Sequence, residues 1–188
     1  MKSDVKILKL MLDHKEERFT IRQISQRLKI NYRIAHEQVG ILEKEGLLMV
    51  VRVGKARLCE LSNKFNHRVF EAEASRRDNL LMNKDIRVLH KRLSELNFNF
   101  IALVFGSYAK GTAKKHSDID ILTIGGDEKE LKRTISLLPN AIHLTAVEES
   151  DFVTMAKSRE FSVVSEAIKN NVILLGIEDY YRLLSNAR

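Results

Sequence analysis

The sequence has only one cysteine, Cys59, among its 188 residues. A chain with one thiol forms no internal disulfide and no zinc site built from several thiolates. Because Cys59 lies in an alternating apolar segment, we expect it to be a small buried residue. The six histidines form no HExxH or HxxxH pair, so a histidine metal cluster is not expected either.

Long apolar runs are also missing from the sequence. The longest, residues 100–106, is far short of the ~20 residues that cross a bilayer. Charges occur throughout the N-terminal segment, which has no unbroken apolar core and no small-residue cleavage site, so it does not resemble a secretion signal. The hydrophobic share of 44% and the charged share of 30% are typical of a globular protein. We therefore expect a cytoplasmic protein without a membrane partner.

Positive charge is in excess and is unevenly distributed. The formal net charge is +7, and residues 1–63 contain 13 Lys and Arg against 8 Asp and Glu, a balance of +5. This asymmetry favours a polyanion as the partner of the N-terminal part. Basic faces without a nucleic-acid partner are also common, so charge alone does not decide the matter.

The first 63 residues have the pattern of three short helices followed by a hairpin. Apolar residues recur at helical spacing in residues 5–12, and Thr20 opens a second helix with the sequence of a capping box. Asn31 is placed to cap a third helix. The apolar period then changes from 3.6 to 2 in residues 48–53 and 56–61, which predicts a hairpin.

The segment ISQRLKINYRIAHEQVGILEKEGLL and the hairpin after it resemble the winged helix-turn-helix family over about the first 63 residues. This resemblance implies a third helix in the DNA major groove and a wing on the backbone or minor groove. It also implies DNA contacts from both elements: Asn31, Tyr32, Arg33 and His36 on the helix, and Arg52, Lys55 and Arg57 on the wing. Such modules often read paired half-sites, so a homodimer is one option. The alternative is a protein–protein module whose polar faces are merely solvated.

The rest of the chain predicts a helical connector and a second domain. Residues 64–97 contain no Pro or Gly and have helical composition, which predicts one long or broken helix. From residue 98 onward strands alternate with helices, which indicates a small α/β or α+β domain. The expected strands are 98–105, 117–124, 141–147 and 172–175, and the expected helices begin at Asp127 and cover 150–158, 161–171 and 178–185. The predicted domains are therefore 1–63, a connector 64–97, and 98–188.

Gly106 and Ser107 follow the predicted strand 98–105 directly. Glycine lets the backbone turn sharply and approach a ligand, and a hydroxyl beside unpaired N–H groups of a following helix suits a phosphate. This is not a Walker loop, because Gly111 is followed by Thr112 where that motif needs Lys, and no GxGxxG occurs. Lys110 adds positive charge that suits a triphosphate, or simply solvent.

Asp118 and Asp120 alternate with isoleucines in the sequence SDIDIL. On a strand both carboxylates project to the same side, about 7 Å apart, where they repel each other. A divalent cation removes this repulsion, and oxygen-only ligands favour Mg²⁺ or Mn²⁺. A purely structural interpretation has Ser117 and Asp118 capping a turn and Asp120 at a rim, but it leaves the adjacent Gly106-Ser107 unexplained.

An apolar strand, Gly-Ser, about ten residues and Asp-x-Asp together resemble the signature of the DNA polymerase β nucleotidyltransferase superfamily, and within it the minimal nucleotidyltransferases. The resemblance implies an α+β chain in which the winged helix-turn-helix precedes a small α/β domain, with a mixed sheet flanked by helices. It implies that Gly106 and Ser107 hold the β and γ phosphates of a nucleoside triphosphate, and that Asp118 and Asp120 bind two Mg²⁺. Lys110 stands where the family has Arg, and Ser117 is counted with the nucleotide-binding residues.

The family places a third carboxylate on a later strand, and this sequence departs from that pattern. The inward positions of residues 141–147 offer His143 or Thr145, and Glu148, Glu149 and Asp151 lie just beyond. The leading hypothesis is a Mg²⁺-dependent transferase of nucleoside monophosphate to an unknown acceptor, with a DNA-binding N-terminal module. The alternative is a DNA-binding transcriptional regulator or antitoxin-like protein, with a protein partner, whose second domain binds nucleotide or is degenerate.

Overall fold

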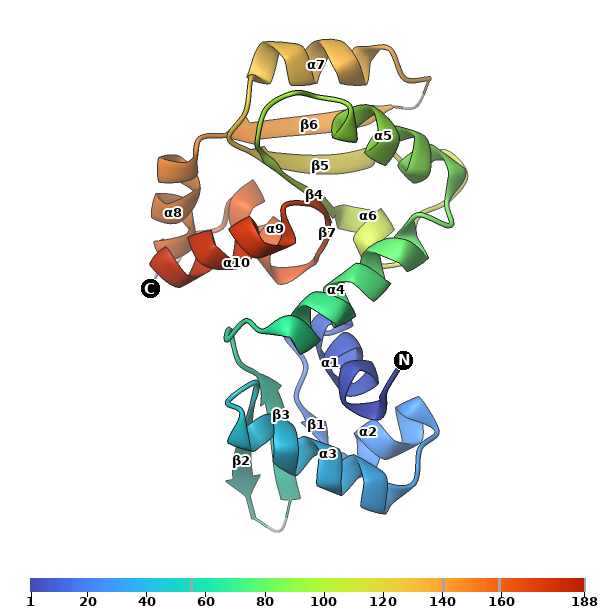
Figure 1. Ribbon diagram of the computed structural model, residues 1–188, viewed down its shortest axis with the longest axis vertical. Helices are drawn as coiled ribbons and strands as arrows, with labels where there is room; N and C mark the ends of the chain where they lie inside the picture. The colour runs from blue at the N-terminus through green and yellow to red at the C-terminus, as the bar shows by residue number, and fades with distance from the viewer. Residues whose placement is uncertain (55, 140, 159, 188) are drawn as a thin grey trace. The chain divides into compact units, whose positions relative to one another are not determined.

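The computed structural model describes residues 1–54, 56–139, 141–158 and 160–187 (Figure 1). The chain divides into two compact units, Met1–Ser75 and Arg76–Arg188, which are treated separately below. No helix within the described residues is long and apolar enough to cross a lipid bilayer.

The first unit consists of helices and a small antiparallel sheet. Its elements are α1 (Ser3–Asp13), β1 (Phe19–Thr20), α2 (Ile21–Leu28), α3 (Tyr32–Lys44), β2 (Leu48–Val53), β3 (Ala56–Leu61) and the first part of α4 (His67–Leu80). The strand order is β1-β3-β2, which leaves β2 at one edge. Side chains from α1, α2, α3 and the sheet are fully buried, among them Leu8, Ile24, Val39 and Cys59.

Local sequence signals set the helix starts in this unit. Thr20 Oγ1 accepts a hydrogen bond from the Gln23 amide at 3.2 Å, and Gln23 Oε1 accepts one from the Thr20 amide at 2.8 Å. The predicted capping box is therefore confirmed. Asn31 caps α3 as predicted, because its Oδ1 accepts from the Arg33 amide at 2.8 Å. Strand β1 was not predicted, since a strand of two residues has no period.

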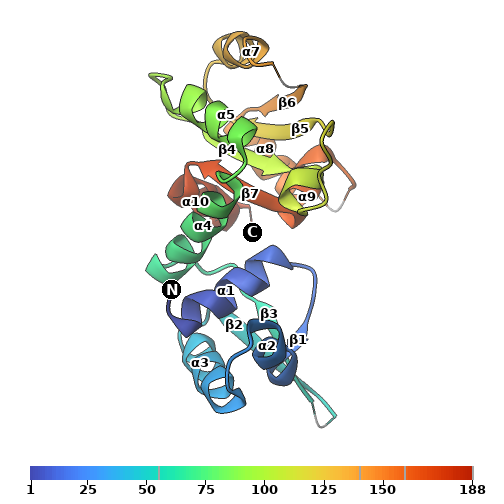
Figure 2. The same cartoon turned by 90° about the vertical axis from the view of Figure 1, so that its right-hand side faces the viewer.

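The second unit contains a mixed four-stranded sheet with helices on both faces (Figures 1 and 2). Its elements are α5 (Lys84–Ser94), β4 (Ile101–Phe105), α6 (Gly106–Ala109), β5 (Ile119–Ile124), α7 (Glu128–Ser136), β6 (Ile142–Val147), α8 (Glu149–Lys157), α9 (Val163–Lys169), β7 (Asn171–Leu175) and α10 (Ile177–Asn186). The strand order is β6-β5-β4-β7; β5 and β6 are parallel, and the other pairs are antiparallel. The predicted α+β class and mixed sheet are confirmed.

The strands of this sheet are buried because helices cover both faces. Leu89 and Leu93 of α5 and Leu131 of α7 pack in one apolar cluster with Val104 and Ile121 of the sheet. Helices α8, α9 and α10 gather on the other side (Figures 1 and 2). The pairing between strands sets the register of β4, β5 and β6, and helices cover both faces of the sheet that they form.

Two boundaries differ from the prediction. The first strand begins at Ile101 rather than at residue 98, and the rings of Phe98 and Phe100, which precede it, pack on each other with centroids 5.4 Å apart. The helical segment between the domains is broken into α4 and α5. Asn83 causes the break, since its Oδ1 accepts from the amides of Asp85 and Ile86 and starts a new helix.

Candidate functional site

The turn from β4 into α6 brings a backbone glycine against a carboxylate. Gly106 has φ +66°, a conformation that L side chains rarely adopt. A Cβ at this position would collide with Oδ2 of Asp120 and would lie 3.2 Å from its Cγ. Glycine therefore lets the Asp120 carboxylate approach the start of α6 directly.

Ser107 is the second residue of the short helix α6, and its backbone holds the chain that follows the helix. Its carbonyl oxygen accepts from the amide of Thr112 at 2.9 Å and from the Thr112 hydroxyl at 3.4 Å. Among the described residues, no side-chain or backbone group makes a hydrogen bond with the Ser107 hydroxyl. The hydroxyl of this loop is thus available to a bound group.

Lys110 and Ser117 both have partners within the protein. Lys110 Nζ lies 3.5 Å from Oε1 of Glu166 on α9, and both side chains are partly exposed. Ser117 Oγ accepts from the amide of Lys114 at 2.8 Å, which closes the turn before Asp118. Sequence reasoning did not find Glu166, because nothing in the local sequence marks a contact between α9 and the loop after α6.

The side chains of Asp118, Asp120 and His143 lie together at one end of the sheet. Asp120 is opposite Phe105 of β4 and opposite His143 of β6. His143 Nε2 lies 3.7 Å from Oδ2 of Asp118, and His143 Nδ1 lies 3.5 Å from Oδ1 of Asp120. Asp118 immediately precedes β5, which begins at Ile119 rather than at the predicted residue 117. Since one imidazole contacts both carboxylates, the two aspartates point to the same side.

The two carboxylates fit a divalent cation. Their side chains are 46% and 30% exposed, so oxygen atoms remain accessible to an ion and to its water ligands. His143 presents a different ring nitrogen to each carboxylate. In this arrangement no three His, Cys, Asp or Glu side chains of the described segments form a group that could hold a metal ion. An ion here would therefore rely on Asp118 and Asp120, together with water and substrate oxygens.

The other candidates for a third carboxylate lie far from Asp120. Glu148 is the N-cap residue of α8, and Glu149 and Asp151 are in its first turn. The Glu149 carboxylate is near Gly125, just beyond the last residue of β5, whereas Asp120 is near the first. Five residues of strand separate these ends by roughly 16 Å. These acidic groups interact favourably with the N-terminus of α8 and do not reach the aspartate pair.

In the first unit, three of the predicted DNA contacts are neighbours. The rings of Tyr32 and His36 have centroids 6.1 Å apart, and Arg57 Nη1 lies 3.4 Å from His36 Nε2. Arg57 also donates to Glu43 at 3.1 Å and stands opposite Arg52 in the hairpin. Arg33 is exposed on α3, whereas Lys55 lies outside the described residues.

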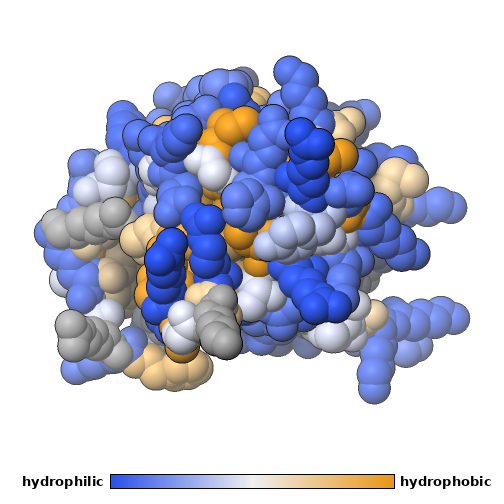
Figure 3. Space-filling model, turned by 90° about the horizontal axis from the view of Figure 1, so that it is seen from below, coloured by the Kyte–Doolittle hydropathy of each residue, from blue (hydrophilic) through white to orange (hydrophobic). Residues whose placement is uncertain are grey.

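A pocket of about 300 Å³ adjoins this face and is lined by Thr20, Ile21, Arg22, Tyr32, Ala56 and Arg57. Arg22 was not singled out from the sequence, because an arginine in the first turn of a helix is usually a solvated residue. Seen from below, the molecular surface is mainly hydrophilic, with hydrophobic side chains between the polar ones (Figure 3). Near this pocket the rings of Tyr32 and His36 lie beside the Arg57 cation.

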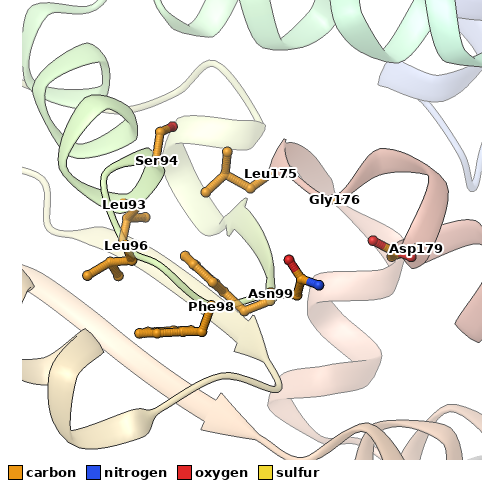
Figure 4. A pocket seen from close by; sticks show the side chains of 9 residues that line it. Leu93, Ser94, Leu96, Phe98, Asn99, Leu175, Gly176 and Asp179 are labelled. Carbon is orange, nitrogen blue, oxygen red and sulfur yellow. The ribbon is translucent and has the colours of Figure 1, made fainter.

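A different pocket of about 290 Å³ lies at the far end of β4 from Gly106 (Figure 4). Leu96, Phe98 and Leu175 supply its apolar walls, and Asn99 and Asp179 supply polar groups. Asp179 is already paired with Arg182 at 2.9 Å. This pocket is separate from the aspartate pair.

Residues 86–175 match the family model described as "Nucleotidyltransferase domain". These residues form a nucleotidyltransferase domain. The nucleotidyltransferase domain contains the whole Gly106-to-His143 site described above, and it begins within α5. No curated protein matches the chain significantly.

Two solved structures are distantly similar to the chain. One is the crystal structure of a toxin–antitoxin with AMP-PNP, at 19% identity and TM-score 0.39, covering 56% of this chain and 84% of that one. The other is a hypothetical protein from Pyrobaculum spherical virus, at 14% identity and TM-score 0.29, covering 99% and 97%. The nucleotidyltransferase domain is identified by the family match at residues 86–175.

Proposed function

We propose that the protein transfers a nucleoside monophosphate from a nucleoside triphosphate to an acceptor hydroxyl, with Mg²⁺ or Mn²⁺ as cofactor. The observation that carries this proposal is the position of the paired Asp118 and Asp120 carboxylates beside the Gly106-Ser107 turn. Divalent cations commonly bridge protein carboxylates and substrate phosphates, so a metal site beside a phosphate loop fits a metal–triphosphate complex.

In this proposal each group of the loop has one task. The backbone at Gly106 and the hydroxyl of Ser107 hold the β and γ phosphates, and Lys110 adds positive charge beside them. Ser117 positions Asp118 through the turn that it closes. Asp118 and Asp120 hold the divalent cation, which neutralises charge on the reacting phosphates when it is bound.

The reaction is a substitution at the α phosphorus. The acceptor oxygen forms a bond to that phosphorus, and the bridging bond to the β phosphate breaks. Pyrophosphate leaves with the electron pair, and the acceptor hydroxyl's proton passes to solvent. The chain holds the triphosphate and the cation in line for this exchange, which is mainly positioning and charge stabilisation.

The decisive experiment incubates the protein with α-labelled ATP, GTP, CTP or UTP, Mg²⁺ or Mn²⁺, and candidate acceptors. Label transfer is expected from the wild type and should be lost in the double variant Asp118→Asn/Asp120→Asn. Asp151→Asn is the matched control, because it removes one carboxylate at the opposite end of the sheet. Label transfer that survives the double substitution refutes the metal role of the pair.

The position of His143 supports a second candidate function. Where the family has a third carboxylate, this chain has an imidazole, so the domain is also suited to bind nucleotide without transferring it. The protein would then be a DNA-binding regulator, or an antitoxin-like protein with a separate protein partner. Nucleotide binding without label transfer to any acceptor favours this candidate.

The N-terminal module, residues 1–63, is proposed to bind DNA. The order of three helices and a two-stranded hairpin is that of a winged helix-turn-helix, with α3 as the recognition helix. Asn31, Tyr32, Arg33 and His36 would contact DNA from α3, and Arg52, Lys55 and Arg57 from the hairpin. Affinity for duplex DNA should fall steeply as salt rises, because phosphate contacts release counterions. Absence of DNA binding at low salt favours a protein partner instead.

A further inference from the structure

The backbone register places His143 beside the aspartate pair independently of its side-chain rotamer. His143 is the residue of β6 directly opposite Asp120 of β5, in a parallel pair that holds from Ile119 to Ile124. Both ring nitrogens lie within 3.7 Å of a carboxylate oxygen. His143 is therefore fixed at the edge of the proposed metal site.

We propose that His143 is a third metal ligand, and that it makes the site prefer a first-row transition ion such as Mn²⁺ over Mg²⁺. This inference rests on the proposed metal role of Asp118 and Asp120. Imidazole nitrogen is a good ligand for divalent transition ions, whereas Mg²⁺ prefers oxygen ligands only. Replacing a carboxylate by a neutral imidazole also removes a negative charge, which weakens the electrostatic attraction on which Mg²⁺ depends.

As they stand, these three side chains do not form a group that could hold a metal ion, so the His143 ring must turn before one of its nitrogens can reach an ion held by the aspartates. Ligand atoms around an octahedral ion at about 2.1 Å are roughly 3 Å apart. The nitrogen–oxygen separations of 3.5 and 3.7 Å are slightly longer than this, and each involves a different nitrogen. Because the His143 side chain is 70% exposed, rotation about its side-chain bonds directs one nitrogen at a shared ion without disturbing the core.

Thr145 and Glu149, the other candidate ligands for a metal ion at Asp118 and Asp120, both lie farther away than His143. Thr145 pairs with Leu122, two residues farther along β6 from the aspartates. Glu149 lies at the other end of β5, near Gly125. Among the described residues of β6 and the start of α8, His143 is therefore the one that the β5–β6 pairing places beside Asp118 and Asp120.

The test is direct measurement of metal binding by the full chain. Electron paramagnetic resonance follows the loss of the free Mn²⁺ signal on binding, and competition gives the affinity for Mg²⁺. Wild-type protein should bind Mn²⁺ at least about tenfold more tightly than Mg²⁺, which is the scale on which ligand environment tunes metal affinity. Pulsed electron paramagnetic resonance should detect magnetic coupling between the bound Mn²⁺ and an imidazole nitrogen.

Three variants separate the outcomes. His143→Ala should lose at least about tenfold in Mn²⁺ affinity and lose the nitrogen coupling, while its affinity for Mg²⁺ changes little. His143→Asp should shift the preference toward Mg²⁺. His116→Ala, which removes an exposed imidazole from the preceding loop, should change neither affinity.

The possible failures are distinguishable. If His143→Ala binds Mn²⁺ as tightly as the wild type, or more tightly, His143 is not a ligand, and the metal role of the aspartates still stands. If the wild type binds neither ion while Asp118→Asn/Asp120→Asn behaves identically, the metal part of the proposed function is refuted together with this inference. Unchanged circular dichroism of each variant establishes that folding is not the cause.

Discussion

The carboxylate of Asp120 occupies the space that a Cβ of residue 106 would fill. The turn from β4 into α6 and the Asp120 carboxylate are therefore in direct contact, and a side chain at position 106 would require Asp120 to move. This contact couples two parts of the motif that are 14 residues apart in the sequence.

Substitution of Gly106 by Ala should damage both the fold and the site. Gly111 provides the matched control, because it has nearly the same φ, +67°, but nothing lies within 4 Å of its missing Cβ. Gly111→Ala should cost about 1–2 kcal/mol of unfolding free energy from backbone strain alone. Gly106→Ala should cost more and should weaken metal–nucleotide binding by about tenfold, as measured by urea unfolding and calorimetry. Equal effects of the two substitutions would contradict the contact with Asp120.

Glu166 should restrain the affinity of the loop for triphosphate. Its carboxylate lies 3.5 Å from Lys110 Nζ and competes with phosphate for that cation. Glu166→Gln should strengthen binding of a non-hydrolysable nucleoside triphosphate by up to about fivefold, since exposed pairs contribute under about 1 kcal/mol. Lys110→Ala should weaken it, and Glu178→Gln, an equal charge change on α10, should have no effect. A decrease of affinity in Glu166→Gln would show that Glu166 orients Lys110 for the ligand.

Glu43 should limit the DNA affinity of the first unit. It accepts from Arg57 at 3.1 Å and so neutralises one of the cations proposed to contact phosphate. Glu43→Gln should raise affinity for duplex DNA at low salt, and Arg57→Gln should reduce the slope of log affinity against log salt by about 1. Fluorescence anisotropy at several salt concentrations measures both, with Arg92→Gln on α5 as the charge-matched control. If the slope of log affinity against log salt is unchanged in Arg57→Gln, Arg57 does not contact DNA phosphates.

Cys59 should be inert toward thiol reagents in the folded protein. Burial raises the pKa of its thiol from 9.0 to about 11, although Arg57 acts in the opposite direction. At pH 8 the folded protein then carries about one hundredth of the thiolate of an exposed cysteine, and the residue is also inaccessible. A chromogenic disulfide should react promptly in urea and negligibly in its absence. Rapid reaction under native conditions would contradict the burial.

The same pKa shift gives a pH dependence of stability. The unfolded thiol loses its proton above about pH 9, whereas the folded thiol keeps its proton until about pH 11. Ionisation therefore stabilises the unfolded chain in this window, and the unfolding free energy should fall as pH rises through it. Cys59→Ala should remove this part of the dependence.

The sequence correctly predicted the elements that depend on interactions between residues close together in the chain. The hairpin strands 48–53 and 56–61 coincide with β2 and β3, and the capping groups of Thr20 and Asn31 are in place. A period of two residues also placed Asp118 and Asp120 on one side. These features depend on neighbours within a few residues, which a sequence displays directly.

Contacts between distant segments could not be predicted in the same way. The pairing of Lys110 with Glu166, and of Arg57 with Glu43, depends on how α9 and α3 pack against other elements. The sequence named His143 as one inward residue of its strand. The parallel register with β5 decided which carboxylates its ring would contact.

Strands β5 and β6 are parallel, so no tight turn can join them, and the chain must travel through α7 before they pair. Pairing of parallel strands across such a connection is slow compared with formation of a helix or hairpin. A chain that has just left the ribosome can therefore carry the complete motif GSYAKGTAKKHSDIDIL while His143 is still remote from it. The side chains of Asp118, Asp120 and His143 therefore come together only after β6 has paired with β5.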